Sequence, residues 1–189
     1  MADTPDIAAT NRIEMQHGEF NPEKNPILRS VIVKTEIQPG FELRQPGWMT
    51  DIPGAKVDLQ VLAEQNERRE HVSGSPDKFY KQIYFTTASG TIYEAANIAN
   101  DMSWRIRAAT TNKENTIRDA ATLEVGKRFQ SPHGINGQPE LDTSPVRSII
   151  ILEEKKRKHA VSLEMNIDGA EVTDIGTQFL QARRQRDSL

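Results

Sequence analysis

The residues of this chain best suited to chemistry are aromatic and cationic, and they lie on or close to one predicted β-hairpin. Aromatic rings stack on nucleic-acid bases while arginines contact phosphates, so this composition is typical of a surface for single-stranded nucleic acid. The other reading is ordinary packing of the rings around a sheet, with the arginines on its outward side. The candidate residues, for nucleic acid or for a protein partner, are Tyr80, Tyr84, Tyr93, Trp104, Arg105 and Arg107.

Catalytic and metal-binding motifs are missing from the sequence. The chain has no cysteine, and it contains no glycine-rich phosphate loop and no H-E-x-x-H pair. The histidines have no partner at helical spacing: His17, His71, His133 and His159. Three carboxylates flank predicted strands, although solvated charge is their ordinary state: Asp119, Glu124 and Asp142. We therefore predict no catalytic residue, no metal and no cofactor, and the chain is more consistent with a binding protein than an enzyme.

The overall composition and charge of the chain limit the class of protein to which it can belong. A net charge of −3 argues against a dedicated binder of duplex DNA, whose phosphate contacts need a basic surplus. The first residues do not form a basic and then apolar leader, and no apolar run approaches the ~20 residues of a membrane span. We expect a soluble, cytoplasmic protein that does not bind membranes.

The element that must position the aromatic residues is a hairpin from Lys78 to Glu94, with a turn at residues 88–90. Alternation along its first arm predicts a core-facing set and a polar-aromatic set. The core-facing residues are Phe79, Ile83, Phe85 and Thr87, and the others are Tyr80, Gln82, Tyr84 and Thr86. The polar-aromatic side is interpreted as wet, as covered by a lid, or as a binding platform.

Further strands follow from alternating apolar residues and Pro/Gly turns. We predict strands within residues 27–37, 41–44, 55–63, 104–108, 123–129, 146–152 and 160–167, and a helical turn just before Trp104. The segment 153–158 is predicted to be the tip of a second hairpin that pairs 146–152 with 160–167. Residues 168–171 resemble a capping box for a last helix, with an apolar stripe of Val172, Ile175, Phe179 and Ala182. That stripe is expected to dock on the chain's own sheet or on a partner.

These elements predict a mainly β (α+β) fold, a small antiparallel β-barrel or sandwich of short strands with a C-terminal helix. Residues 1–26 are expected to be a flexible arm, 27–168 a β-rich domain, and 169–189 the helix and tail. The leading hypothesis is a non-enzymatic module that acts through protein–protein contacts, within an oligomer or larger assembly, using Val172, Ile175 and Phe179 as a docking helix. The alternatives are a single-stranded nucleic-acid-binding protein and a small-molecule-binding or enzymatic β-barrel.

Overall fold

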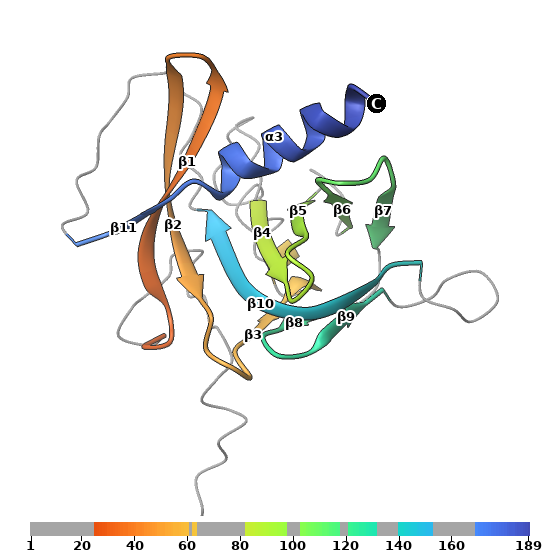
Figure 1. The fold of residues 1–189 in the computed structure, drawn as a ribbon. Coiled ribbons are helices and arrows are strands. Elements are labelled where there is room, and N and C mark those ends of the chain that lie inside the picture. Colours follow the sequence, from red (N-terminus) through yellow and green to blue (C-terminus); the bar gives the residue numbers. More distant parts are fainter. Residues whose placement is uncertain are drawn as a thin grey trace, which may run out of the picture.

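A computed structural model of the chain describes residues 25–60, 62–63, 82–97, 103–117, 121–131, 140–152 and 169–189. They form a mainly β fold with a C-terminal helix, α3 (Ile175–Asp187) (Figure 1). No helix in these ranges is long and apolar enough to cross a membrane. The strands are β1 (Arg29–Gln38), β2 (Phe41–Thr50), β3 (Lys56–Asp58), β4 (Gln82–Thr87), β5 (Ile92–Asn97), β6 (Trp104–Ala108), β7 (Glu114–Ile117), β8 (Thr122–Glu124), β9 (Arg128–Gln130), β10 (Asp142–Leu152) and β11 (Glu171–Thr173).

One large sheet organises the described chain, in the order β11-β1-β2-β10-β4-β5-β6-β7, with β9 paired to β10 and a separate β3-β8 pair. The sheet is mixed, because β11 runs parallel to β1 while the other neighbours are antiparallel. The mainly β class with a C-terminal helix is thus confirmed. Within the described ranges β7 and β11 do not pair, so closure into a barrel stays a prediction.

The predicted Lys78–Glu94 hairpin is confirmed for its described residues, and the predicted strand at 27–37 pairs with the predicted return strand at 41–44. β4 and β5 pair antiparallel around a turn in which Gly90 has a φ of 82°. β1 and β2 pair around Gly40, whose φ is 80°, and β2 is longer than the predicted return strand. Both glycines adopt the left-handed region that side chains with a Cβ avoid, which explains why these turns were readable from the sequence.

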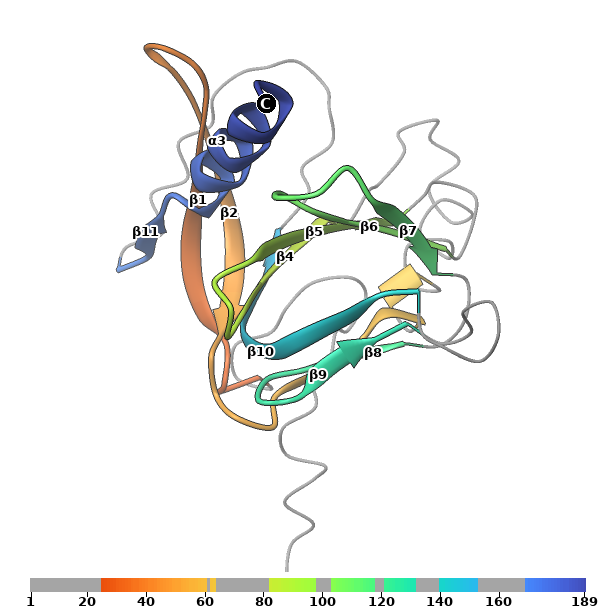
Figure 2. The same ribbon diagram turned by 45° about the vertical axis from the view of Figure 1, so that its right-hand side comes forward.

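Both faces of the large sheet are covered, and alternation along β4 and β10 separates two cores (Figure 2). Ile83 and Phe85 lie in the first core, which they share with residues of β3, β8 and β9. Tyr84 and Ile150 point to the opposite face and lie in the second core, beneath α3. β10 is buried on both sides at its C-terminal end because β2 and β4 flank it and a core lies on each face.

The segment 55–63 is only partly a strand. β3 ends at Asp58, and residues 59–60 and 62–63 are helical. The backbone N–H of Gln60 donates to Oδ1 of Asp58 at 3.0 Å, a local bond that favours a turn over further extension. Val57 and Leu59 are both buried and stand two residues apart, as in a strand, although the strand ends between them at Asp58.

The C-terminal prediction needs a correction at its start. Glu171–Thr173 is a strand that pairs with β1, so Val172 is not part of the helical stripe and is 54% exposed. α3 begins after Asp174, which makes no side-chain capping bond, and the predicted capping box is therefore wrong. Ile175 and Phe179 are buried against the chain's own sheet, which decides between the two docking surfaces left open by the sequence.

Several predictions fall outside the described residues: most of the N-terminal arm, Phe79, Tyr80, all four histidines, Asp119, the 153–158 tip and the strand at 160–167. The helical turn before Trp104 is wrong for residues 95–97, which belong to β5. Both edges of Ile149–Ile151 are occupied by β2 and β4, so these residues have no free edge for the predicted pairing with 160–167.

α3 meets β1 at a very close approach that depends on Gly176. A Cβ at this position would collide with Oγ1 of Thr35 and lie 3.0 Å from the carbonyl oxygen of Lys34. The next residue, Thr177, accepts a hydrogen bond from the N–H of Glu36 at 2.8 Å. The helix start therefore covers the outer edge of β1 just beyond the residues that pair with β11.

We predict that Gly176→Ala destabilises the protein by about 1–3 kcal/mol, because overpacking exceeds the gain of about 1 kcal/mol in helix propensity. Gln181→Ala, on the exposed side of the same helix, is the matched control and should change stability by less than about 0.5 kcal/mol. Urea unfolding followed by circular dichroism measures both. A stabilised Gly176→Ala protein would show that the close approach is wrong.

Candidate interaction surface

The aromatic residues singled out from the sequence are buried in the folded chain. Tyr84 is 6% exposed, Tyr93 9% and Trp104 2%. A base cannot stack on rings that are already covered, so the interpretation of these three residues as a stacking platform is wrong. Tyr80, the fourth aromatic candidate, lies outside the described residues.

Tyr93 and Trp104 belong to the first core. The ring of Tyr93 stacks on Phe85, with centroids 4.8 Å apart and an angle of 5° between the ring planes. The indole Nε1–H of Trp104 donates to the carbonyl oxygen of Leu59 at 2.8 Å. This bond satisfies the one polar group of the ring, which lets Trp104 serve as a core residue.

Tyr84 lies on the other face of the sheet, in a polar cluster under α3. Nε2 of Gln82 donates to the Tyr84 hydroxyl at 3.1 Å and to a carboxylate oxygen of Glu94. Nε–H of Arg107 donates to the second oxygen of the same carboxylate. β4, β5 and β6 each supply residues to this cluster, and cross-strand pairing places Tyr84, Glu94 and Arg107 in one row. The polar-aromatic side is therefore covered by a lid, one of the three possibilities named from the sequence.

Phe179 of α3 is the residue that closes this cluster. Its ring centroid lies 5.7 Å from that of Tyr84, and the guanidinium carbons of Arg107 and Arg183 lie 5.7 and 5.9 Å from it. The sequence predicts Tyr84 and Arg107 on an external surface and Phe179 as a separate docking residue. The fold brings all three together, because the helix is the covering partner of the sheet.

Burial changes the acidity of the tyrosines. Desolvation raises the pKa of Tyr84 well above its usual range, and the nearby charge of Glu94 raises it further. The pKa of Tyr93 is also raised, first by burial and then by Asp142. Both phenols are therefore neutral at physiological pH, and neither is suited to act as a proton acceptor there.

The remaining charged candidates form surface ion pairs. Nε of Arg105 lies 2.9 Å from Glu114, on the exposed side of β6. Asp142 pairs with Arg128 at 3.2 Å. Glu124 lies 3.1 Å from Lys127 and 3.8 Å from Lys56. Within the described ranges, no three His, Asp or Glu side chains lie close enough together to hold a metal ion.

The surface that the sequence did not single out is the outer part of the β1–β2 hairpin, residues 34–46, which we call the hairpin arm. β11 pairs with β1 only at Val31–Val33, and β10 pairs with β2 only at Gly47–Thr50. Beyond those points β1 and β2 pair with each other. The tip of the arm projects away from α3 and the remaining strands in both views (Figures 1 and 2).

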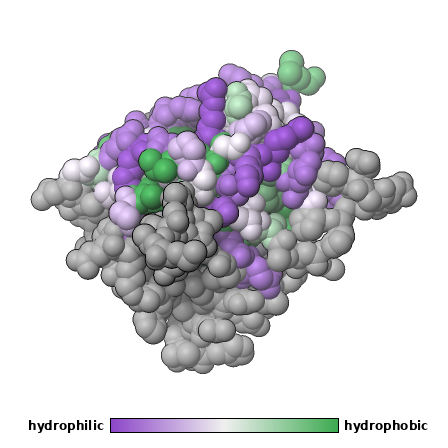
Figure 3. All heavy atoms as spheres, turned by 90° about the horizontal axis from the view of Figure 1, so that it is seen from below, coloured by the Kyte–Doolittle hydropathy of each residue, from purple (hydrophilic) through white to green (hydrophobic). Residues whose placement is uncertain are grey.

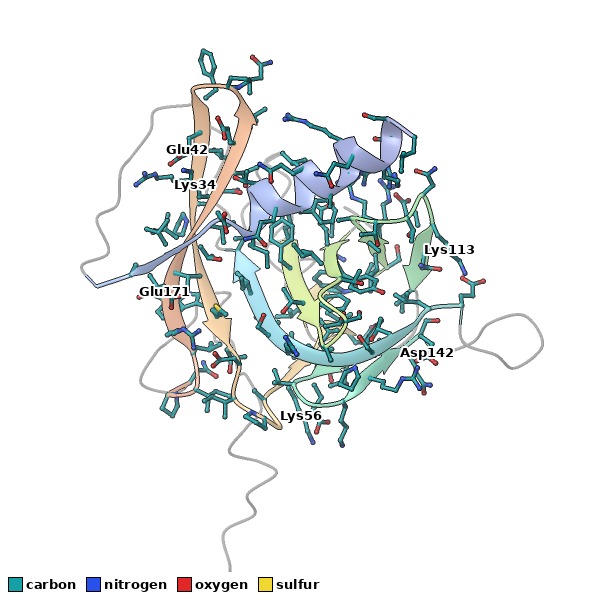
Figure 4. All side chains as sticks on the ribbon, in the orientation of Figure 1. Lys34, Glu42, Lys56, Lys113, Asp142 and Glu171 are labelled. Carbon is teal, nitrogen blue, oxygen red and sulfur yellow. The ribbon has the colours of Figure 1, made fainter. Side chains whose placement is uncertain are left out.

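The hairpin arm is amphipathic and carries exposed apolar side chains. Phe41 is 69% exposed, Ile37 47% and Leu43 43%. Alternation along β2 puts Phe41 and Leu43 on one face and Glu42 and Arg44 on the other. Glu42 lies 2.7 Å from Lys34 and 2.5 Å from Arg44, and Lys34 and Glu42 are seen side by side in Figure 4.

The other large apolar side chains exposed in the described ranges are Ile52, Val172 and Leu189, which lie in separate parts of the chain. In the view from below, hydrophilic residues predominate among the coloured atoms and apolar ones occur in small groups (Figure 3). Single exposed apolar residues are normal, whereas three on one projecting element call for an explanation. The sequence alone could have indicated this surface, since the apolar residues Ile37 and Phe41 directly flank residues 38–40, a Gln-Pro-Gly turn between two predicted strands.

Comparison with protein-family models, with curated proteins and with solved structures gave no significant match. Function must therefore be inferred from the residues of this chain and their arrangement.

Arg107→Met should destabilise the protein by about 1–3 kcal/mol, because it leaves the carboxylate of Glu94, whose side chain is only 9% exposed, without its cation. This cost is lower than that of breaking a fully buried ion pair, because the side chain of Arg107 is itself 37% exposed. Arg105→Met, two residues along the same strand, removes a pair that is about half exposed and should cost less than about 1 kcal/mol. Equal effects of the two variants in urea unfolding would contradict the buried cluster.

The raised pKa of Tyr84 predicts a pH dependence of stability. Below about pH 10 both the folded and the unfolded chain keep this phenol protonated, and it contributes no slope. Above about pH 10 the unfolded chain loses the proton while the folded chain keeps it, so the free energy of unfolding falls as pH rises. Tyr84→Phe should show a shallower fall, and Tyr93 and Lys34, whose pKa values are also raised, should contribute to the fall that remains. An unchanged slope in denaturant titrations above pH 10 would contradict the burial of Tyr84.

Proposed function

We propose that this chain is a non-enzymatic interaction module that binds another protein chain through its hairpin arm. The observation that carries the proposal is the group of exposed apolar side chains on this projecting element, Ile37, Phe41 and Leu43. Removing Phe41 from water on binding would be favourable by about 1.5–3 kcal/mol, and aromatic residues are common anchors of interfaces.

The arrangement of the arm supports contact with a macromolecule. Its apolar and charged faces are separate, which allows one face to be buried while Lys34, Glu42 and Arg44 stay solvated. The arm is held at its base by β11, β10 and α3, so little conformational entropy is lost when it binds. For the body of the molecule we propose that the curved sheet and the β3-β8 pair enclose the first core as a barrel-like or sandwich-like unit.

The two alternative functions are not favoured by a comparable observation. Of the aromatic residues predicted to stack on nucleic-acid bases, the three in the described ranges are buried: Tyr93 and Trp104 in the first core, and Tyr84 beneath α3. A ligand site in a barrel mouth would need convergent polar groups around an apolar pocket. The polar cluster of Gln82, Tyr84 and Glu94 is instead hydrogen-bonded within itself and covered by Phe179.

Site-specific photo-cross-linking tests the proposal. A photoreactive phenylalanine analogue at position 41 should give a discrete adduct with a second protein chain, and the same analogue at position 128, an exposed residue of β9, should not. The purified partner should then bind Phe41→Ser and Leu43→Ser proteins at least about tenfold more weakly than wild type. Identical adducts from both positions, or unchanged affinities, would overturn the proposal.

A further inference from the structure

Within the described ranges, the edge of β2 that faces away from β1 has no pairing strand along residues 41–46. On the β1 side, Thr177 accepts from the N–H of Glu36 at 2.8 Å, and Arg184 donates to the carbonyl of Ile37 at 2.5 Å. On the other side, pairing with β10 stops at Gly47, and no strand or helix of the described ranges continues it along residues 41–46. Such an edge is a template for one more strand.

We infer that this edge pairs with the same edge of a second copy of the chain, antiparallel and about a two-fold axis at Leu43. The inference rests on the proposed function and names its partner. A two-fold axis perpendicular to a sheet places one residue opposite its own copy, so the symmetric registers near the middle of the edge centre on position 42, 43 or 44.

Charge selects among these registers. Centring on Glu42 sets two carboxylates opposite each other, and centring on Arg44 sets two guanidinium groups opposite each other, both of which are unfavourable. Centring on Leu43 places each Glu42 opposite Arg44 of the other copy. The alternation of these three residues along β2 is therefore complementary to itself in one register.

The apolar residues agree with the same register. It places Leu43 against Leu43 of the second copy, and Phe41 of each copy opposite Gln45 of the other. Phe41 and Leu43 of both copies then lie together on one face of a continuous β1-β2-β2-β1 sheet, which partly buries side chains that are 69% and 43% exposed in the single chain. Pro46 lies just outside the paired residues, so its missing N–H costs no bond.

Charge reversal in the full chain tests the pairing by sedimentation velocity over about 10–500 μM, the range suited to a small interface. Wild type should show a reversible dimer. Arg44→Glu alone and Glu42→Arg alone should each dimerise at least about tenfold more weakly, because like charges then face each other. An equimolar mixture of the two variants should recover dimer, since each glutamate again faces an arginine. Arg128→Glu, away from the arm, should dimerise like wild type.

The absence of cysteine from the chain allows a direct test of the register. Under mild oxidation Leu43→Cys should form a disulfide-linked dimer, because directly opposite residues have Cβ atoms close enough for this bond. Glu42→Cys and Arg44→Cys should form it much more slowly. A wild-type chain that stays monomeric at all concentrations, variants that dimerise equally, or a mixture without recovery would overturn the pairing. A discrete adduct from position 41 with a different protein would survive that result, so the proposed function is tested separately.

Discussion

A sheet that is apolar on both sides has to be covered on both sides, and this constraint shapes the whole molecule. The first face is covered by the separate β3-β8 pair and by β9, which pairs with β10. The second is covered by α3, which arrives from the C-terminal end of the chain and brings Phe179 onto Tyr84. The close packing of Gly176 against β1 and the hydrogen bond from the N–H of Glu36 to Oγ1 of Thr177 fix the position of the helix start on the sheet.

Because α3 covers the second face of the sheet, that face is not available for contact with other molecules. The polar residues there are bonded to each other within one chain, so the aromatic side of the β4–β5 hairpin is internal. α3 covers the outer edge of β1 at Glu36, whereas in the described ranges the pairing of β10 with β2 extends only over Gly47–Thr50. In the described part of the chain this leaves an amphipathic hairpin arm with one edge covered by the helix and one edge without a pairing strand.

The sequence predicts local structure well here, because turns and alternation are local. The β4–β5 hairpin, the β1–β2 hairpin and the apolar end of β10 all follow from residue spacing and Pro/Gly turns. Non-local pairing is what it misses. Glu171–Thr173 becomes a strand only because β1 has a free edge there, and Tyr84 is buried only because α3 packs on it. Neither partner is visible from the residues alone.

Assigned NOE spectra of the wild-type protein test the central claim most directly. Rings whose centroids lie 5.7 Å apart should give strong cross-peaks between the aromatic protons of Tyr84 and Phe179. The account predicts these cross-peaks together with slow exchange of the Glu36 amide proton, which is bonded to Thr177. Absent cross-peaks, with Tyr84 protons in contact with solvent, would show that the helix does not cover the sheet and would contradict the account.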